Sequence, residues 1–194
     1  MNIPAYTPTP TQLSSPPKPP LSLPNNRVSL RQSNKPIDPV VSWTSSIARH
    51  CRNGQLAQAA AEFQRMRLAG IEPNHVTFVT LFSGCADFPL ESVVFGSSIH
   101  AYVRKFGLLT NNVMVGTALL DMYAKCSRMD LARMVFDEMG VKNSVSWNTM
   151  INGYMRNGKI EDAIDLFDQM PKRDAISWTA LIGGFVKKDH FEQA

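Results

Sequence analysis

The sequence lacks the features that mark several common protein classes. Its longest apolar stretches are interrupted by polar residues every three or four positions, so none approaches the about 18 residues that a membrane span requires. It has only three cysteines, Cys51, Cys85 and Cys126, which lie far apart and form no CxxC pair. This excludes a disulfide framework and a cysteine metal site. We therefore expect a soluble protein without a membrane partner, with all three cysteines buried in helices in a reducing compartment.

Acidic residues are absent from residues 1–37, which hold nine prolines, eight Ser or Thr, and four basic residues. An acid-free, hydroxyl-rich N-terminus without a continuous apolar region is typical of an organelle transit peptide rather than a secretory signal. The prolines between Pro4 and Pro24 forbid the amphipathic helix of mitochondrial presequences, which favours a chloroplast over the alternative, a mitochondrion. A disordered, proline-rich leader is the other reading of residues 1–37.

Excess charge is also missing from the rest of the chain. The formal net charge of +4 arises within the leader, because all sixteen acidic residues follow residue 37, beside sixteen of the twenty basic ones. Any phosphate binding by the body of the protein must therefore come from local placement of cations and not from bulk charge.

What the chain does contain, from Val40 onward, is an internal repeat. Three segments share a Ser-Trp core: Val40–Thr44, Ser144–Asn148 and Ala175–Thr179. Three further columns recur at fixed distances from Trp43, Gly116 and Trp147. They are an alanine 16 residues later (Ala59, Ala132, Ala163), a phenylalanine 20 later (Phe63, Phe136, Phe167) and a methionine 23 later (Met66, Met139, Met170).

Each copy is expected to form a hairpin of two helices. Apolar residues from Trp147 to Tyr154 and again from Ile160 to Phe167 follow the 0, 3, 4, 7 spacing of one helical face. Gly54 and Gly158 lie between the two halves, where a left-handed residue lets the chain reverse. A single hairpin exposes most of its apolar face, so we predict an all-α solenoid of stacked hairpins.

The repeat boundaries divide the chain into a leader at 1–37 and units at 40–74, 75–112, 113–143 and 144–174, with a truncated fifth unit at 175–194. We expect eight helices in four hairpins and a ninth from about Trp178 with an incomplete partner, as in a fragment of a longer protein. Two irregularities stand out. About two extra residues near Phe88-Pro89 predict a longer turn, and Ser127 replaces the expected turn glycine.

The motifs at residues 145–154 (VSWNTMINGY), 116–126 (GTALLDMYAKC) and 99–108 (IHAYVRKFGL) resemble the pentatricopeptide-repeat family. The alternation of 35-, 38- and 31-residue units is similar to the plant PLS subfamily, and the chain resembles the N-terminal part of an organelle RNA-editing factor. The resemblance implies sequence-specific binding of single-stranded organelle RNA, one repeat per nucleotide.

The resemblance also implies which residues read the bases: the one after the aromatic position of the first helix, paired with the last residue of the unit. These pairs are Thr44 with Asn74, Val79 with Asn112, Thr117 with Asn143, and Asn148 with Asp174, while Thr179 has no partner within the chain. Thr with Asn favours adenine by analogy, Asn with Asp favours uracil, and Val79 leaves its unit nearly without preference. Helix capping is the alternative role of these short polar residues.

Two further columns take roles from the resemblance. Apolar residues three positions before the first reading residue are expected to stack against bases: Val41, Val76, Met114, Val145 and Ile176. Cations near the helix end are expected to bind phosphates: Arg52, Lys125, Arg156 and Lys187, with Asp87 in this column of the second unit. Packing between hairpins and helix-dipole complementation are the respective alternatives. The tryptophans Trp43, Trp147 and Trp178 and the histidine His100 are interpreted as structural.

No catalytic site is expected, so the chain is not predicted to be an enzyme. A zinc deaminase needs His-x-Glu and Pro-Cys-x-x-Cys; only His190 precedes a glutamate, Glu192, at that spacing, and no cysteine lies near it. We expect no metal and no cofactor. For cytidine-to-uridine editing or other RNA processing, the resemblance implies other editing-complex proteins as partners, including a deaminase supplied in trans or by a missing C-terminal region. The alternative function is a protein–protein interaction scaffold.

Overall fold

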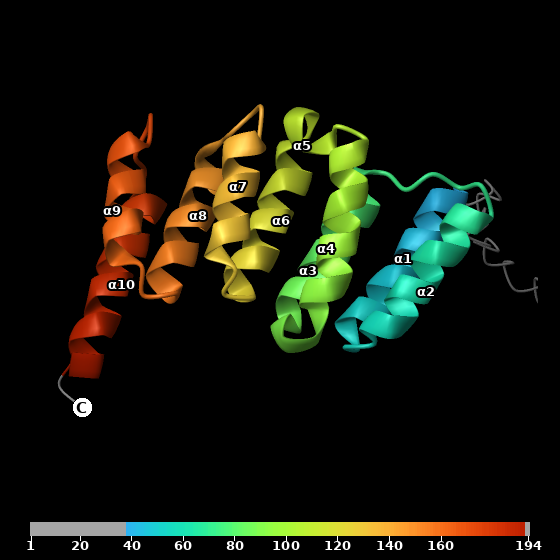
Figure 1. Cartoon of the computed structure of the whole chain (residues 1–194), viewed down its shortest axis with the longest axis horizontal. Coiled ribbons are helices and arrows are strands. Elements are labelled where there is room, and N and C mark those ends of the chain that lie inside the picture. The colour runs from blue at the N-terminus through green and yellow to red at the C-terminus, as the bar shows by residue number, and fades with distance from the viewer. Residues whose placement is uncertain (1–37, 193–194) are drawn as a thin grey trace, which may run out of the picture. The chain divides into compact units, whose positions relative to one another are not determined.

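The computed structural model of the chain describes residues 38–192, and the side chains of residues 90, 91 and 187–192 are outside the description. The leader predicted at residues 1–37 therefore lies outside the described residues, as does the side chain of Lys187. Every regular element in the described range is a helix (Figure 1), which confirms the all-α class. The helices are α1 (Pro39–Arg52), α2 (Leu56–Leu68), α3 (His75–Asp87), α4 (Pro89–Lys105), α5 (Leu108–Asn111), α6 (Val113–Lys125), α7 (Met129–Glu138), α8 (Ser144–Arg156), α9 (Ile160–Gln169) and α10 (Ala175–Glu192).

The helices pair as the repeat pattern predicts. Four hairpins form, from α1 with α2, α3 with α4, α6 with α7, and α8 with α9. The first helix of each hairpin also packs against the first helix of the next, in the order α1, α3, α6, α8, α10. These five helices, the inner row, therefore form one continuous layer, with the second helices beside it (Figure 1).

The turns follow from local chemistry. Gly54 and Gly158 have φ angles of 70° and 73°, the left-handed conformation expected at the end of a first helix. Ser127 takes the same conformation with φ 57°, at the position where glycine was expected. Closing residues of the units start the next helix, because the side-chain oxygens of Asn74, Asn112 and Asn143 accept hydrogen bonds from backbone N–H groups in its first turn.

Three expectations about the helices were wrong. The turn near Phe88 is a single residue and not a longer loop, because Pro89 begins α4 at once and the extra residues lengthen that helix to 17 residues. A further four-residue helix, α5, follows it. The last helix begins at Ala175 and runs to Glu192, so no incomplete partner forms within the described residues. No glycine follows Gly184 to permit a left-handed turn.

The repeated apolar columns form the core. The alanine column is fully buried, and the phenylalanine and methionine columns are at most 7% exposed: Ala59, Ala132, Ala163, Phe63, Phe136, Phe167, Met66, Met139 and Met170. Their fixed spacing therefore reflects packing inside and between hairpins.

Glycines bring consecutive inner-row helices close together. A Cβ atom on Gly84 of α3 would lie 2.6 Å from the Cys51 side chain of α1, and one on Gly153 of α8 would lie 2.8 Å from the Ala124 side chain of α6. Gly184 of α10 meets Met155 of α8 in the same way. In α6 the corresponding residue is Met122, whose sulfur packs against Gly96 of α4 instead. None of the described helices has the length and apolar character to cross a bilayer.

Candidate nucleic-acid interface

The apolar residues predicted to stack against bases lie at the solvent-facing side of the inner row. Their exposed fractions range from 47% to 63%: Val41, Val76, Met114, Val145 and Ile176. Each stands in the first turn of its helix, so the five recur once per unit. Apolar side chains that are this exposed contribute little to the core, and packing between hairpins does not explain their exposure. Their regular recurrence makes this row a surface suited to flat apolar ligands.

The fourth unit brings its predicted reading pair into direct contact. The Nδ2 group of Asn148 donates to both carboxylate oxygens of Asp174, at 3.2 and 3.3 Å, although the residues are 26 positions apart. The backbone N–H of Ser177 also donates to this carboxylate. These bonds, first that from Ser177 and then that from Asn148, lower the pKa of Asp174, so the carboxylate is ionised at neutral pH. Asn148 is 5% exposed, and its Oδ1 has no partner among the described residues.

The reading pairs of the first and third units form different hydrogen bonds. In the first unit Thr44 and Asn74 are linked through the hydroxyl of Thr77. In the third unit Asn143 caps α8, while the hydroxyl of Thr117 is buried without a partner among the described residues.

The reading residues of the second and fifth units offer fewer free hydrogen-bonding groups to a base. In the second, Asn112 caps α6 and the side chain of Val79 offers no hydrogen bond. In the fifth, the hydroxyl of Thr179 donates to the backbone oxygen of Ala175 at 2.7 Å. The hydroxyl of Thr179 is therefore already used within its own helix.

Two pockets lie between consecutive inner-row helices. One of about 390 Å³ between α6 and α8 is lined by Met114 and Val145 together with Thr117 and Asn143. It therefore places both members of a reading pair between two apolar side chains.

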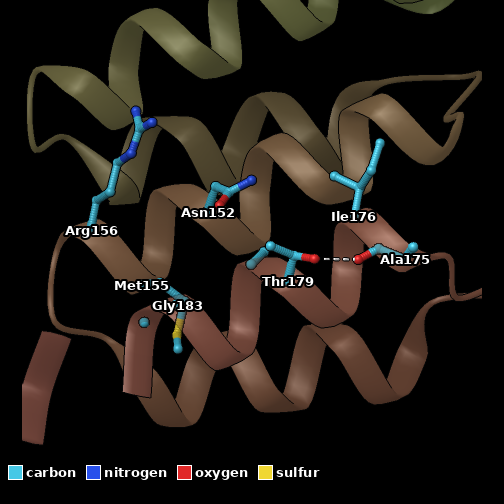
Figure 2. A pocket seen from close by; sticks show the side chains of 9 residues that line it. Asn152, Met155, Arg156, Ala175, Ile176, Thr179 and Gly183 are labelled. Atoms are coloured by element: carbon cyan, nitrogen blue, oxygen red, sulfur yellow. Dashed lines mark hydrogen bonds between the residues drawn. The ribbon is translucent and has the colours of Figure 1, made fainter. Parts of the chain in front are cut away.

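The second pocket, of about 380 Å³, lies between α8 and α10 and is lined by Asn152, Arg156, Ile176 and Thr179. Figure 2 shows Arg156, Asn152 and Ile176 projecting to the same side of these helices. Each pocket therefore combines a predicted reading residue with a predicted stacking residue, and this one adds a cation.

The predicted phosphate-binding cations are not equivalent. Arg52 and Arg156 are exposed, and no carboxylate of the described side chains forms an ion pair with either. Lys125 instead pairs with Asp121 at 2.9 Å and lies 4.0 Å from Asp87 of the preceding unit. Its charge is therefore partly neutralised within the protein.

The aromatic and titratable residues interpreted as structural pack inside the fold. Trp147 meets Phe136 edge to face at 4.9 Å, and Trp178 meets Phe167 at 4.7 Å, although Trp178 is half exposed. His100 is buried and bonds the Tyr123 hydroxyl at 2.9 Å, and burial lowers its pKa.

Two of the three cysteines, Cys51 and Cys85, are buried in helices as expected, whereas Cys126 lies just after the end of α6 and is only partly buried. Burial raises the pKa of the Cys51 thiol to about 11 and that of Cys85 to about 12, so both remain protonated. No group of three potential metal ligands gathers in the described part of the chain.

Sequence reasoning missed one set of residues at this surface: the buried hydroxyl side chains of Thr77, Ser146 and Ser177. Each follows the closing residue of a unit by three positions and bonds to it. The spacing of an Asn or Asp three residues before a Ser or Thr was the available signal.

Comparisons with known proteins agree with the fold. The profile of the PPR repeat family matches residues 39–87 and 142–176, and that of the PPR repeat matches residues 117–144 and 176–194. A chloroplastic pentatricopeptide repeat-containing protein of Arabidopsis thaliana is 55% identical over 63% of this chain and 25% of its own length. A mitochondrial one from the same plant is 45% identical over 61% of this chain and 17% of its own length. The chain thus spans a quarter or less of the length of these relatives.

Solved structures show the same architecture. The crystal structure of the maize pentatricopeptide repeat protein PPR10 superposes with a TM-score of 0.64 and 17% identity, over 81% of this chain and 23% of that one. PPR10 in complex with an 18-nt psaJ RNA element gives a TM-score of 0.62 and 23% identity, over 80% of this chain and 24% of that one. From the matched profiles, which between them cover most of residues 39–194, and from this shared fold, the chain belongs to the pentatricopeptide-repeat family.

Proposed function

We propose that this chain binds single-stranded RNA along its inner-row helices, with one repeat opposite each nucleotide. The observation that carries the proposal is the row of exposed apolar side chains, with a polar pair beside it in three units. Unpaired bases present apolar faces and polar edges, and this alternation matches both. The solved complex of PPR10 with an RNA element shows that this fold is compatible with such a ligand.

Each reading pair has a defined chemical task. In the fourth unit the Asn148 amide donates to Asp174, which leaves its Oδ1 as a buried acceptor without a protein partner. Burying an unpaired acceptor is unfavourable, and a base N–H would satisfy it. Uracil offers such a group at N3, which fits the preference expected from the family resemblance.

We further propose that the protein acts in an organelle, a chloroplast before a mitochondrion, in cytidine-to-uridine editing or other RNA processing. The names of the relatives include both chloroplastic and mitochondrial proteins. The PLS-type alternation of unit lengths supports an editing role, with deamination supplied in trans or by a region outside this sequence.

Binding to single-stranded RNA over a salt titration tests the proposal. The exposed Arg156 should contribute one phosphate contact, so Arg156→Ala should weaken all RNA sequences alike and reduce the slope of log affinity against log salt by about 0.7 to 1. Arg65→Ala is the control, because Arg65 is an exposed cation on α2, outside the inner row, and pairs there with Glu62 at 3.0 Å. Affinity that did not depend on salt, or equal effects of both variants, would instead favour the protein-scaffold alternative.

A further inference from the structure

A column of buried hydroxyl residues lies behind the reading pairs. Thr77, Ser146 and Ser177 are each the third residue of an inner-row helix, and each is 0% exposed. Polar side chains are rarely buried without a bonding role. In α6, which follows the second unit, the third residue is Val115.

In the first unit this hydroxyl connects the two reading residues. The Oδ1 atom of Asn74 accepts from the backbone N–H of Thr77 at 3.1 Å and from its hydroxyl at 3.2 Å. The same Thr77 hydroxyl lies 2.7 Å from the hydroxyl of Thr44. A hydroxyl has a single proton, and that of Thr77 goes to Asn74, so Thr44 must be the donor in the second bond.

The direction of this relay decides what a base would meet. Thr44 donates its only proton to Thr77, so its oxygen has only acceptor capacity left for a base. The Oδ1 atom of Asn74 accepts from Thr77, so its Nδ2 group is left to donate to a base. The first unit therefore presents one acceptor and one donor in a fixed arrangement.

In the third unit the equivalent serine does not form the relay, although the reading pair is again Thr with Asn. The hydroxyl of Ser146 lies 3.2 Å from Oδ1 of Asn143, as in the first unit, but it also donates to the backbone oxygen of Asn143 at 2.9 Å and accepts from its backbone N–H at 2.9 Å. It forms no hydrogen bond with Thr117. Ser177 is oriented in the same way toward the backbone of Asp174. The hydroxyl of Thr117 consequently has no partner and can rotate to donate or accept.

The difference follows from the side chains themselves. The additional methyl group restricts threonine to fewer χ1 rotamers than serine. Both serine hydroxyls bond the backbone N–H and C=O of the closing residue, and neither bonds the first reading residue. The hydroxyl of Thr77 bonds Thr44 instead, in addition to the side chain of Asn74.

We infer that the buried hydroxyl residue at the third position of α3, α8 and α10 is a positioning residue that sets the base specificity of the preceding unit. Threonine there fixes the hydrogen-bond direction of a Thr–Asn pair, and serine leaves it free. This inference rests on the proposed function, since it concerns how the same surface selects a base. It predicts that the first and third units, with identical reading pairs, discriminate among bases to different degrees.

The test is selection from a pool of single-stranded RNA with randomised sequence, followed by sequencing of the RNA retained by the 194-residue chain. Thr77→Ser should relax selection at one nucleotide, from about tenfold to about twofold, the range expected when one specific contact loses its geometry. Ser146→Thr should sharpen selection at the nucleotide two positions away. Thr77→Val has a similar shape but no hydroxyl, so it should relax base selection at the same nucleotide as Thr77→Ser. It covers the case in which the serine of Thr77→Ser still forms the two hydroxyl bonds.

Controls separate specificity from folding and from binding itself. Total RNA retained and the thermal midpoint of helical circular dichroism should change little for Thr77→Ser and Ser146→Thr, since both keep the helix cap. Unchanged base profiles in both Thr77 variants, or an equal loss for all four bases, would overturn the inference while leaving RNA binding intact. If the unchanged chain retained no RNA, the proposed function itself would fall.

Discussion

Replacing Asn148 with threonine while keeping Asp174 should change the base preferred opposite the fourth unit. The Asn148 amide presents Oδ1 in a fixed plane, because its Nδ2 group is held by both oxygens of Asp174. Threonine at the same position offers one shorter, rotatable hydroxyl. By analogy with the family's reading pairs, the preference should move from uracil toward guanine.

The size of the effect can be bounded from the structure. Asn148 is only 5% exposed, so a base bonded to it would be largely shielded from water. A change of pattern against one base edge in such a site is worth about 1–3 kcal/mol, or about 5- to 150-fold in relative affinity. The fold itself should be little affected, since Asp174 keeps its bond from the backbone of Ser177.

Competition binding measures this directly. An RNA selected by the unchanged chain is prepared with each of the four bases at the nucleotide opposite the fourth unit, and each competes against the selected form. Asn111→Thr, the same substitution on the exposed surface of α5, should leave the preference unchanged. A uniform loss of affinity without a change of preference would show that Asn148 serves only the start of its helix, and the reading assignment of the whole array would fail with it.

Three further perturbations have defined outcomes. Ser127→Gly should raise the free energy of unfolding, measured in urea, by about 1 kcal/mol, because the left-handed conformation is unfavourable for serine but not for glycine. Gly158→Ser should lower it by a similar amount, since Gly158 is left-handed too and a Cβ atom there would meet no neighbour within 4 Å; changes of the same sign would contradict this explanation. The folded-state pKa of Asp174 lies below its ordinary value of 3.8, so its contribution to stability is complete above that pH and is lost as pH falls through the lowered pKa. Asp174→Asn should therefore make the free energy of unfolding depend less on pH below pH 3.8. An unchanged pH dependence in that range would refute this prediction. Deleting residues 1–37 should abolish import into isolated chloroplasts and leave RNA binding nearly unchanged; loss of base selection on deletion would make the basic leader part of the site.

Much of the fold was predictable because each unit repeats the same packing problem. The columns through Ala59, Phe63 and Met66 recur at fixed spacing since each occupies an equivalent buried position. The turn at Gly158 was predictable because its backbone conformation has a direct residue preference. The single-residue turn at Phe88 was missed, because an insertion can lengthen a helix as easily as a loop.

The candidate site was predictable only in part. The family resemblance singled out the column that contains Val145, which is exposed in the structure, but the partners of polar groups depend on distances across units. The ion pair of Lys125 with Asp87 joins neighbouring units, and no spacing within one unit reveals it. The Thr77 relay likewise depends on a side-chain rotamer, which the presence of a threonine at that position does not reveal.

The close approach at Gly84 and Gly153 has a consequence for the length of RNA that the units can follow. At their own junctions these glycines let consecutive inner-row helices approach closely. Under the proposed binding of one repeat to each nucleotide, that helix spacing would set the distance between one base position and the next. Alanine at either position would push two helices apart, and every later unit would be displaced with them. A covalent strand can extend to follow one such step, but the mismatch persists along all units beyond it. Under the proposed function, small residues that contact no base would therefore help to match the spacing of the units to the spacing of the nucleotides.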